Sequence, residues 1–311
     1  MFGKTLNVAK AFLWTLRFIV FTLIIAPAIF SETAVGPDFL LTEPHARTAA
    51  MSNAFVAISD DANALIFNPA GLAMLEKNSF SLTHYASFAD TNYENFLFAV
   101  NSGNFGYGGR ILVDYTADFT EIDSNGASAG NVYNYDFLAQ ASAAWELFPG
   151  VSAGVSVKYF KSALSRYMKD GVALDAGTII KFYECPDMYF GLAIKNAGFQ
   201  GAYESVPDTL PLKLSAGLGC KQKVNEWLGI TAAADLDRVL INKYMPNIGL
   251  GVEASIYDMF YISGGLGLKD TGDTFTAGAG FKPFEHVKIS YAFQPYEDLG
   301  ATHRISLDIF Y

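Results

Sequence analysis

Hydrophobic and polar residues alternate along most of the chain after Asn78. In the segment VSAGVSVKY (residues 151–159), valine, alanine and tyrosine take the odd positions, and serine, glycine and lysine take the even ones. The segments LKLSAGL (212–218), NIGLGVEASI (247–256) and VKISYAF (287–293) repeat this pattern. A period of two residues predicts β-strands with one apolar and one polar face.

The predicted strands have the length and the number of a membrane barrel. Each segment has about ten residues, which a tilted strand needs to cross a bilayer. There are about fourteen segments, and an even number is the rule in single-chain bacterial barrels. The predicted ranges are 79–88, 94–101, 104–114, 132–145, 151–162, 171–182, 187–196, 210–220, 227–237, 246–256, 259–268, 273–281, 285–294 and 302–311.

The connections and the C-terminus support the same fold. Gaps after even-numbered segments are short, as at FPG (148–150), whereas several gaps after odd-numbered segments are long, as around 115–131. Barrels with short turns at one end and long loops at the other show this difference. The chain ends on RISLDIFY (304–311), which alternates and closes with an aromatic residue.

Composition agrees with a membrane-facing surface. Apolar residues make up 51% of the chain and aromatic residues 15%, while charged residues make up only 17%, below the roughly 25% of soluble domains. No long apolar run follows residue 31, so apolar surface must come from alternating strands. The formal net charge of −10 argues against nucleic acid as a partner.

The N-terminus has the features of a secretory signal peptide. Lys4, Lys10 and Arg17 precede the apolar run FIVFTLIIAPAIF (18–30). That run is short for a membrane helix, and small residues near position 31 offer a cleavage site. We therefore predict a signal peptide at residues 1–31. An uncleaved anchor helix is the alternative, although Arg17 would lie within it.

The segment before the first predicted strand reads differently. In DDANALIFNPAGLAML (60–75), Asp60 and Asp61 can cap a helix, and Asn68 followed by Pro69 can start another. Fourteen strands enclose a lumen, which larger barrels leave open unless something fills it. We predict an all-β membrane fold, a fourteen-stranded antiparallel transmembrane barrel (78–311), with residues 32–77 as a short helical hatch in its lumen.

A resemblance to a known family adds to this. ARTAAMSNAFVAISDDANALIFNPAGLA (46–73) resembles the N-terminal signature of the PorV/PorQ proteins, which belong with FadL-like outer-membrane barrels. LPLKLSAGLG (210–219) and LGATHRISLDIFY (299–311) resemble later segments of that family. Ala50 and Ser52 stand where more glycine is typical. The resemblance implies a fourteen-stranded barrel with an internal hatch, in the outer membrane of a Gram-negative-type bacterium.

The resemblance implies two alternative functions. PorV-like proteins serve a type IX secretion system, so the partners would be secreted cargo proteins or other secretion-system subunits. FadL-like proteins move long-chain fatty acids or other hydrophobic small molecules through the outer membrane. The modest outer loops resemble PorV more, so secretion is the first expectation and transport the alternative. Outer-membrane lipid is a partner in both cases.

Candidate site residues follow from these patterns. The hatch motif (Asp60, Asp61, Asn68, Pro69, Ala70 and Gly71) is read as structural, with gating as a further role; Asp60 and Asp61 are also a candidate cation pair. Phe55, Leu65, Ile66 and Phe67 are a candidate hydrophobic pocket. The resemblance implies a lateral opening at a kink in the third strand, for which Gly106, Gly108 and Gly109 are candidates. Cys185 and Cys220 lie near neighbouring strand ends in an oxidising compartment, so a disulfide is an open alternative to two free thiols.

Charges on the polar face have mixed signs. We expect them to form pairs that hold the hatch, because a selective ring would carry one sign. The four histidines have no metal-ligand spacing, and the sequence has no glycine-rich phosphate loop or G-x-S-x-G turn. We therefore expect no enzyme activity, metal or cofactor. The charged residues are Lys158, Asp175, Lys181, Lys195, Lys213, Asp235, Asp237, Glu253, Lys288, Arg304 and Asp308.

Overall fold

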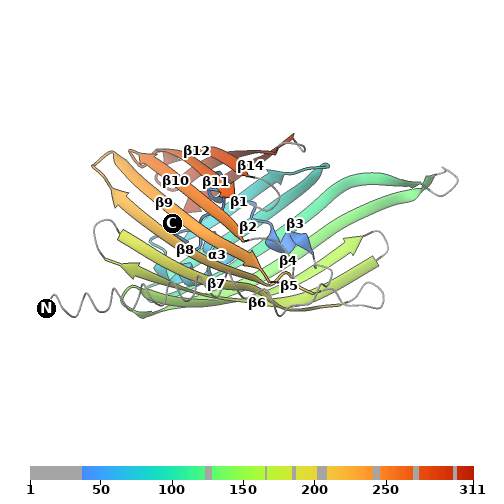
Figure 1. Cartoon of the computed structure of the whole chain (residues 1–311), viewed down its shortest axis with the longest axis horizontal. Coiled ribbons are helices and arrows are strands. Elements are labelled where there is room, and N and C mark those ends of the chain that lie inside the picture. Colours follow the sequence, from blue (N-terminus) through green and yellow to red (C-terminus); the bar gives the residue numbers. More distant parts are fainter. Residues whose placement is uncertain are drawn as a thin grey trace.

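The strands close into a single barrel. A computed structural model describes residues 37–122, 128–164, 167–183, 187–201, 209–240, 246–268, 273–296 and 300–311. Across these residues, fourteen antiparallel strands pair in sequence order, and the first also pairs with the last (Figure 1). The predicted fold class is therefore confirmed. The predicted signal peptide lies outside the described residues.

The strands have the following bounds: β1 (Ser79–Ala86), β2 (Thr91–Ser102), β3 (Phe105–Ile122), β4 (Ser128–Phe148), β5 (Val151–Leu164), β6 (Tyr167–Phe182), β7 (Asp187–Gln200), β8 (Lys213–Lys223), β9 (Leu228–Val239), β10 (Asn247–Ile256), β11 (Phe260–Leu268), β12 (Thr274–Phe284), β13 (Val287–Tyr296) and β14 (Gly300–Phe310). We call the end where β1 begins and β14 ends the terminal rim, and the opposite end the distal rim. Connections span two to four residues on the terminal rim and two to twelve on the distal rim.

Strands β3 and β4 are much longer than their predicted ranges. Their hairpin extends beyond the other strands at the distal rim (Figure 1). In the segment from 115 to 131, expected to be largely a loop, residues 115–122 and 128–131 belong to the two strands, with Phe119 opposite Val132 after a register shift. Its acidic, glycine- and serine-rich composition is typical of a loop, but cross-strand pairing decides its structure.

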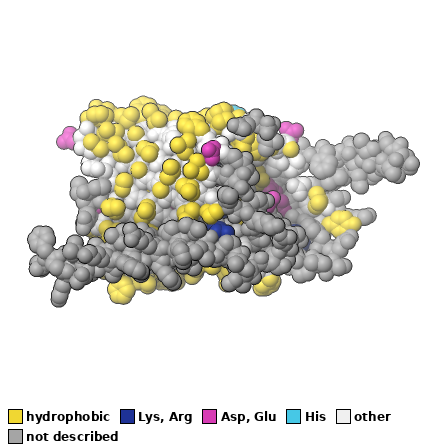
Figure 2. All heavy atoms as spheres, in the orientation of Figure 1, with side chains coloured by type: hydrophobic (Ala, Val, Ile, Leu, Met, Phe, Trp, Pro, Cys, Tyr) yellow, Lys and Arg dark blue, Asp and Glu magenta, His cyan; other side chains and the backbone are white. Residues whose placement is uncertain are grey.

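Side chains alternate between lumen and outer face as predicted. On β5, Ser152, Ser156 and Lys158 point inward and are buried, whereas Val155 and Val157 point outward and are about half exposed. Figure 2 shows hydrophobic side chains gathered over the outer face of the strands. This outer face has the character of a surface that meets lipid chains.

The hatch, residues 37–77, lies inside the barrel. It contains η2 (Asp38–Leu41), α2 (Ala46–Ala50), α3 (Ala64–Phe67) and η3 (Pro69–Met74). Asn68 caps η3 because its side-chain oxygen accepts a hydrogen bond from the Ala70 backbone N–H at 3.2 Å. Among the described residues, no helix has the length and apolarity needed to cross a membrane.

Inward-facing glycines let the hatch touch the wall. A Cβ atom added to Gly154 of β5 would lie 2.5 Å from the Pro69 carbonyl carbon, and one on Gly251 of β10 would lie 2.6 Å from the Met51 Cβ. Such distances are far below van der Waals contact, so any larger residue would displace the hatch. Glycines of β3, β5, β6, β7, β8, β10, β11 and β12 form this contact: Gly106, Gly154, Gly177, Gly191, Gly217, Gly219, Gly249, Gly251, Gly265 and Gly278.

Candidate functional site

A largely buried ion network centred on Arg47 joins the hatch to the wall. Its guanidinium lies 2.6 Å from Asp60, 2.8 Å from Asp61 and 2.8 Å from Glu253 of β10. Asp60 also pairs with Lys221 of β8 at 2.7 Å. Burial alone would raise the pKa of Asp60, but Arg47 and Lys221 hold that pKa well below its usual range. The predicted acidic pair is thus the hatch side of an ion-paired anchor.

A second network lies on the side of the hatch nearer the distal rim. The carboxylate of Glu43 lies 3.2 Å from Lys195 of β7 and 3.0 Å from Lys213 of β8. Lys213 also pairs with Asp237 of β9 at 2.7 Å. Burial would raise the pKa of Glu43, yet the two lysines lower it to about 2. Glu43 is therefore ionised and fixed between two strands.

Backbone groups of the hatch are bound by two polar side chains. Asp235 of β9 accepts hydrogen bonds from the Phe55 and Val56 backbone N–H groups, at 2.6 and 2.7 Å. The Asn68 side-chain amide donates to the Val56 carbonyl at 3.0 Å and to the Thr178 carbonyl of β6 at 3.1 Å. Asn68 thus caps η3 and also joins two parts of the hatch to the wall.

The predicted pairing of mixed lumen charges is visible in these contacts. Five of the predicted lumen residues contact the hatch directly: Glu253, Lys195, Lys213, Asp235 and Asp308, the last of which lies 3.0 Å from His45. Lys288 lies 3.9 Å from the wall residue Glu253, which in turn contacts the hatch. Lys158 and Asp175 instead pair within the wall at 2.6 Å. The hatch partners Glu43, His45 and Arg47 were not among the predicted residues. Their charged or polar side chains, in a segment that also holds several small residues, are the signal that could have identified them.

The candidate pocket residues pack together. Phe55, Leu65, Ile66 and Phe67 are at most 4% exposed and belong to one core cluster, which joins hatch residues to inward-facing wall residues such as Leu97 of β2. The rings of Phe55 and Phe67 are 5.4 Å apart. These side chains fill space within that cluster, and a ligand-binding role for them stays a prediction.

The glycines proposed to kink the third strand do not open the wall here. Gly106, Gly108 and Gly109 pair with β2 and β4 on both sides, without a register shift. A Cβ on Gly106 would overlap the Leu72 carbonyl of the hatch, so close approach of the hatch explains glycine at this position.

Of the two cysteines in the predicted disulfide, the structure describes only Cys220. Cys220 lies on β8 opposite Met188 of β7, and its side chain points to the outer face. Cys185 lies outside the described residues, so the pairing of the two cysteines stays a prediction.

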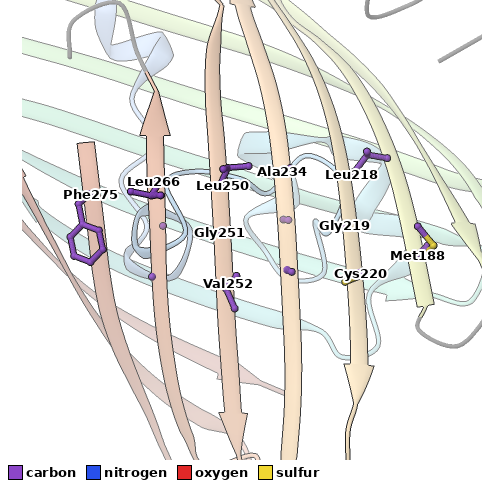
Figure 3. A pocket seen from close by; sticks show the side chains of 14 residues that line it. Met188, Leu218, Gly219, Cys220, Ala234, Leu250, Gly251, Val252, Leu266 and Phe275 are labelled. Atoms are coloured by element: carbon purple, nitrogen blue, oxygen red, sulfur yellow. The ribbon is translucent and has the colours of Figure 1, made fainter. Parts of the chain in front are cut away.

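Two cavities stand out among the described residues. One is a groove of about 580 Å³ on the outer face of β7–β12. Ala234 of β9 lies there between Leu218 of β8 and Leu250 of β10, and Phe275 of β12 lies farther along the groove (Figure 3). Its lining is apolar, and it faces the surroundings of the barrel. The other, of about 690 Å³, lies between hatch and wall at the terminal rim. Within the described part of the chain, no group of three His, Cys, Asp or Glu side chains is arranged to hold a metal.

Comparisons with known proteins identify relatives and the fold. The sequence profile of an uncharacterised protein family, UPF0164, matches residues 38–209, more than half of the chain. Two UPF0164 proteins of Treponema pallidum (strain Nichols) are 30% identical over 166 residues and 26% identical over 165 residues. These matches cover 46% and 49% of this chain, but only 38% and 50% of the relatives. The chain thus spans half or less of their length.

Solved structures share the architecture at low identity. The CymD monoaromatic hydrocarbon channel superposes with a TM-score of 0.60 at 11% identity, covering 86% of this chain and 97% of that one. A Pseudomonas aeruginosa FadL homologue has a TM-score of 0.55 at 12% identity and covers 86% of this chain and 98% of its own. The Pseudomonas putida toluene transporter TodX has a TM-score of 0.55 at 11% identity and covers 86% of this chain and 96% of its own. At such identity the likeness shows a FadL-like fold alone.

Proposed function

This chain belongs to the UPF0164 family, and from its structure we propose that it is an outer-membrane channel for hydrophobic small molecules, closed by its hatch. The proposal favours transport over the secretion role expected first from the PorV/PorQ resemblance. None of the relatives and structures named above is described as a secretion component, whereas CymD and TodX are described as carrying aromatic hydrocarbons.

An apolar layer inside the lumen carries the proposal. Leu112, Leu138 and Phe160 point inward from β3, β4 and β5, and they neighbour one another across the strands. They pack against Phe39 and Leu40 of η2, and all five are at most 7% exposed. The interior of a water-filled barrel is polar, so an apolar layer suits hydrophobic cargo and disfavours sugars or ions.

The attachment of the hatch supports a gated path. Ion pairs and hydrogen bonds hold it, and these contacts can break and re-form without covalent change. Passage would require part of the hatch to move away from the wall. The outer face and the N-terminal sequence support placement in the outer membrane.

Uptake into liposomes tests this function. Liposomes that contain the barrel should take up a monoaromatic hydrocarbon or a fatty acid faster than protein-free liposomes, and should exclude glucose. Phe160→Ser should slow hydrocarbon uptake, whereas Tyr159→Ser, at the outward-facing neighbour, should not. Equal rates for glucose and hydrocarbon, or no uptake above the protein-free rate, would refute the proposal. A secreted protein that co-purifies with the barrel would favour the secretion role instead.

A further inference from the structure

The cavity at the terminal rim has the size of a ligand site. Hatch residues 57–60 form part of its lining, together with the inward-facing side chains Lys181, Tyr189 and Lys221 of β6, β7 and β8. Its lip includes Trp227 and Tyr257, in the turns that follow β8 and β10. The volume of about 690 Å³ is within the range of small-molecule pockets. Because hatch and inward-facing residues line it, the cavity opens toward the lumen side of the rim.

Two exposed aromatic rings stand side by side on the lip. The ring centroids of Trp227 and Tyr257 are 6.3 Å apart, and the residues are 46% and 70% exposed. The Asn225 side chain accepts hydrogen bonds from the Trp227 and Leu228 backbone N–H groups at 3.0 and 2.8 Å. The Tyr257 backbone N–H donates to the Trp227 carbonyl at 2.7 Å. The backbones that carry the two rings are thus fixed relative to each other.

The backbone at Tyr257 is unusual for an aromatic residue. Tyr257 and Asp258 have φ values of 55° and 50°, in the left-handed region that tight hairpin turns normally fill with asparagine or glycine. A bulky side chain in this region costs free energy. Asparagine would form the turn more easily, so the tyrosine ring has a use beyond the turn itself.

The cavity already binds ammonium groups with rings and carboxylates. Lys221 Nζ lies 5.0 Å from the Tyr189 ring centroid and 2.7 Å from Asp60. Lys181 Nζ lies 5.4 Å from the same ring and 2.9 Å from Asp187. Five carboxylates line the cavity, namely Asp60, Glu76, Asp187, Glu226 and Asp258. Asp60 also pairs with Arg47 and Asp258 pairs with Lys282, so Glu76 and Glu226 are the lining carboxylates for which the described contacts give no cation partner. Within the described contacts, no lysine or arginine side chain lies over the ring of Trp227 or Tyr257.

We propose that this cavity binds an organic cation, with its alkylated ammonium or guanidinium group against the Trp227 and Tyr257 rings. Electron-rich ring faces attract such cations, and the carboxylates of Glu76 and Glu226 in the lining add negative charge. The cation is either a small free amine or a lysine or arginine side chain of a polypeptide, since both carry this chemistry. The inference goes beyond hydrocarbon transport and does not depend on it.

Titration calorimetry on the purified barrel in detergent tests the site. Tetramethylammonium and an arginine-containing tripeptide are the probes, and tert-butanol is the neutral compound of similar shape. We expect saturable binding of at least one cation and none of tert-butanol. Tyr257→Asn keeps a residue suited to the turn, and it should weaken cation binding roughly five- to thirtyfold, as should Trp227→Ala.

Phe284→Ala is the matched control, because Phe284 is an exposed aromatic residue of β12 outside the lining of this cavity; it should bind as wild type. An unchanged melting temperature confirms that each variant is folded. Binding of the tripeptide alone supports the site and identifies a polypeptide as the source, whereas binding of tetramethylammonium supports a small amine. No saturable binding, equal binding of tert-butanol, or wild-type binding by folded Tyr257→Asn and Trp227→Ala would overturn the proposal.

Discussion

Replacing Arg47 by methionine should release the hatch from the wall. The Arg47 side chain is 11% exposed and contacts Asp60, Asp61 and Glu253 within 2.8 Å. Methionine keeps apolar contact with the Phe55 ring, over which the guanidinium now lies at 5.1 Å, but it leaves three carboxylates close together. Removing one partner of a buried ion pair typically costs about 3–5 kcal/mol.

That cost corresponds to a large change in the populations of bound and released hatch. At about 1.4 kcal/mol for each factor of ten, the ratio of released to bound hatch should rise by roughly two to four powers of ten. Hydrogen exchange should become faster at residues 46–67, and planar bilayers should show more frequent current openings. Adding Glu253→Gln should restore part of the protection, because it removes one uncompensated charge.

Lys77→Met is the matched control for this experiment. Lys77 also links the hatch to the barrel, through Glu285 at 3.7 Å, but both side chains are exposed, at 47% and 74%. An exposed pair of this kind contributes little, so this variant should behave as wild type. If Arg47→Met shows the exchange rates and currents of Lys77→Met, the Arg47 network does not anchor the hatch.

Three further predictions concern the fit and charge of the hatch. Gly154→Leu should expel η3 and make liposomes leak small solutes, because an added Cβ would lie 2.5 Å from Pro69; Gly264→Ala, whose Cβ would have 3.8 Å of space, should not leak. The pKa of Glu43 is lowered from 4.5 to about 2, so ionised Glu43 should stabilise the bound hatch fully above about pH 4.5, and this stabilisation should disappear as the pH falls toward 2. Hydrogen exchange of η2 measures the loss, and Glu43→Gln should remove this pH dependence. Deleting residues 33–75 should open a pore, and a variant that stays impermeable would show that something else closes the lumen.

Strand positions could be predicted because alternation is a local property. Inward and outward faces follow from a period of two, and the inward serines and glycines of β5 and β10 lie where that period puts them. The ends of β3 and β4 could not be predicted, since their composition is typical of a loop and only pairing with each other extends them. The reason for the inward glycines, which is close contact with the hatch, could not be predicted either, because the hatch is far away in sequence.

The anchor of the hatch depends on contacts across long sequence separations. Arg47 and Glu253 are 206 residues apart, and no local pattern connects them. The sequence singled out Asp60 and Asp61 as a pair but not the arginine between them. It also could not distinguish apolar residues that pack, such as Phe67, from apolar residues that line a pocket, because both are hydrophobic at similar spacing.

Two helices of the hatch, α2 and η3, contact opposite ends of the barrel sequence, which has a consequence for folding order. η3 packs against β2–β6, whereas α2 packs against β11–β14. η3 and its strands are close in sequence, whereas the strands that cover α2 are far from it, and such distant contacts form slowly. The inward glycines leave no clearance for threading the hatch into a finished barrel. We therefore expect the last strands to fold around the hatch, which acts as their template, before β14 pairs with β1 and closes the barrel.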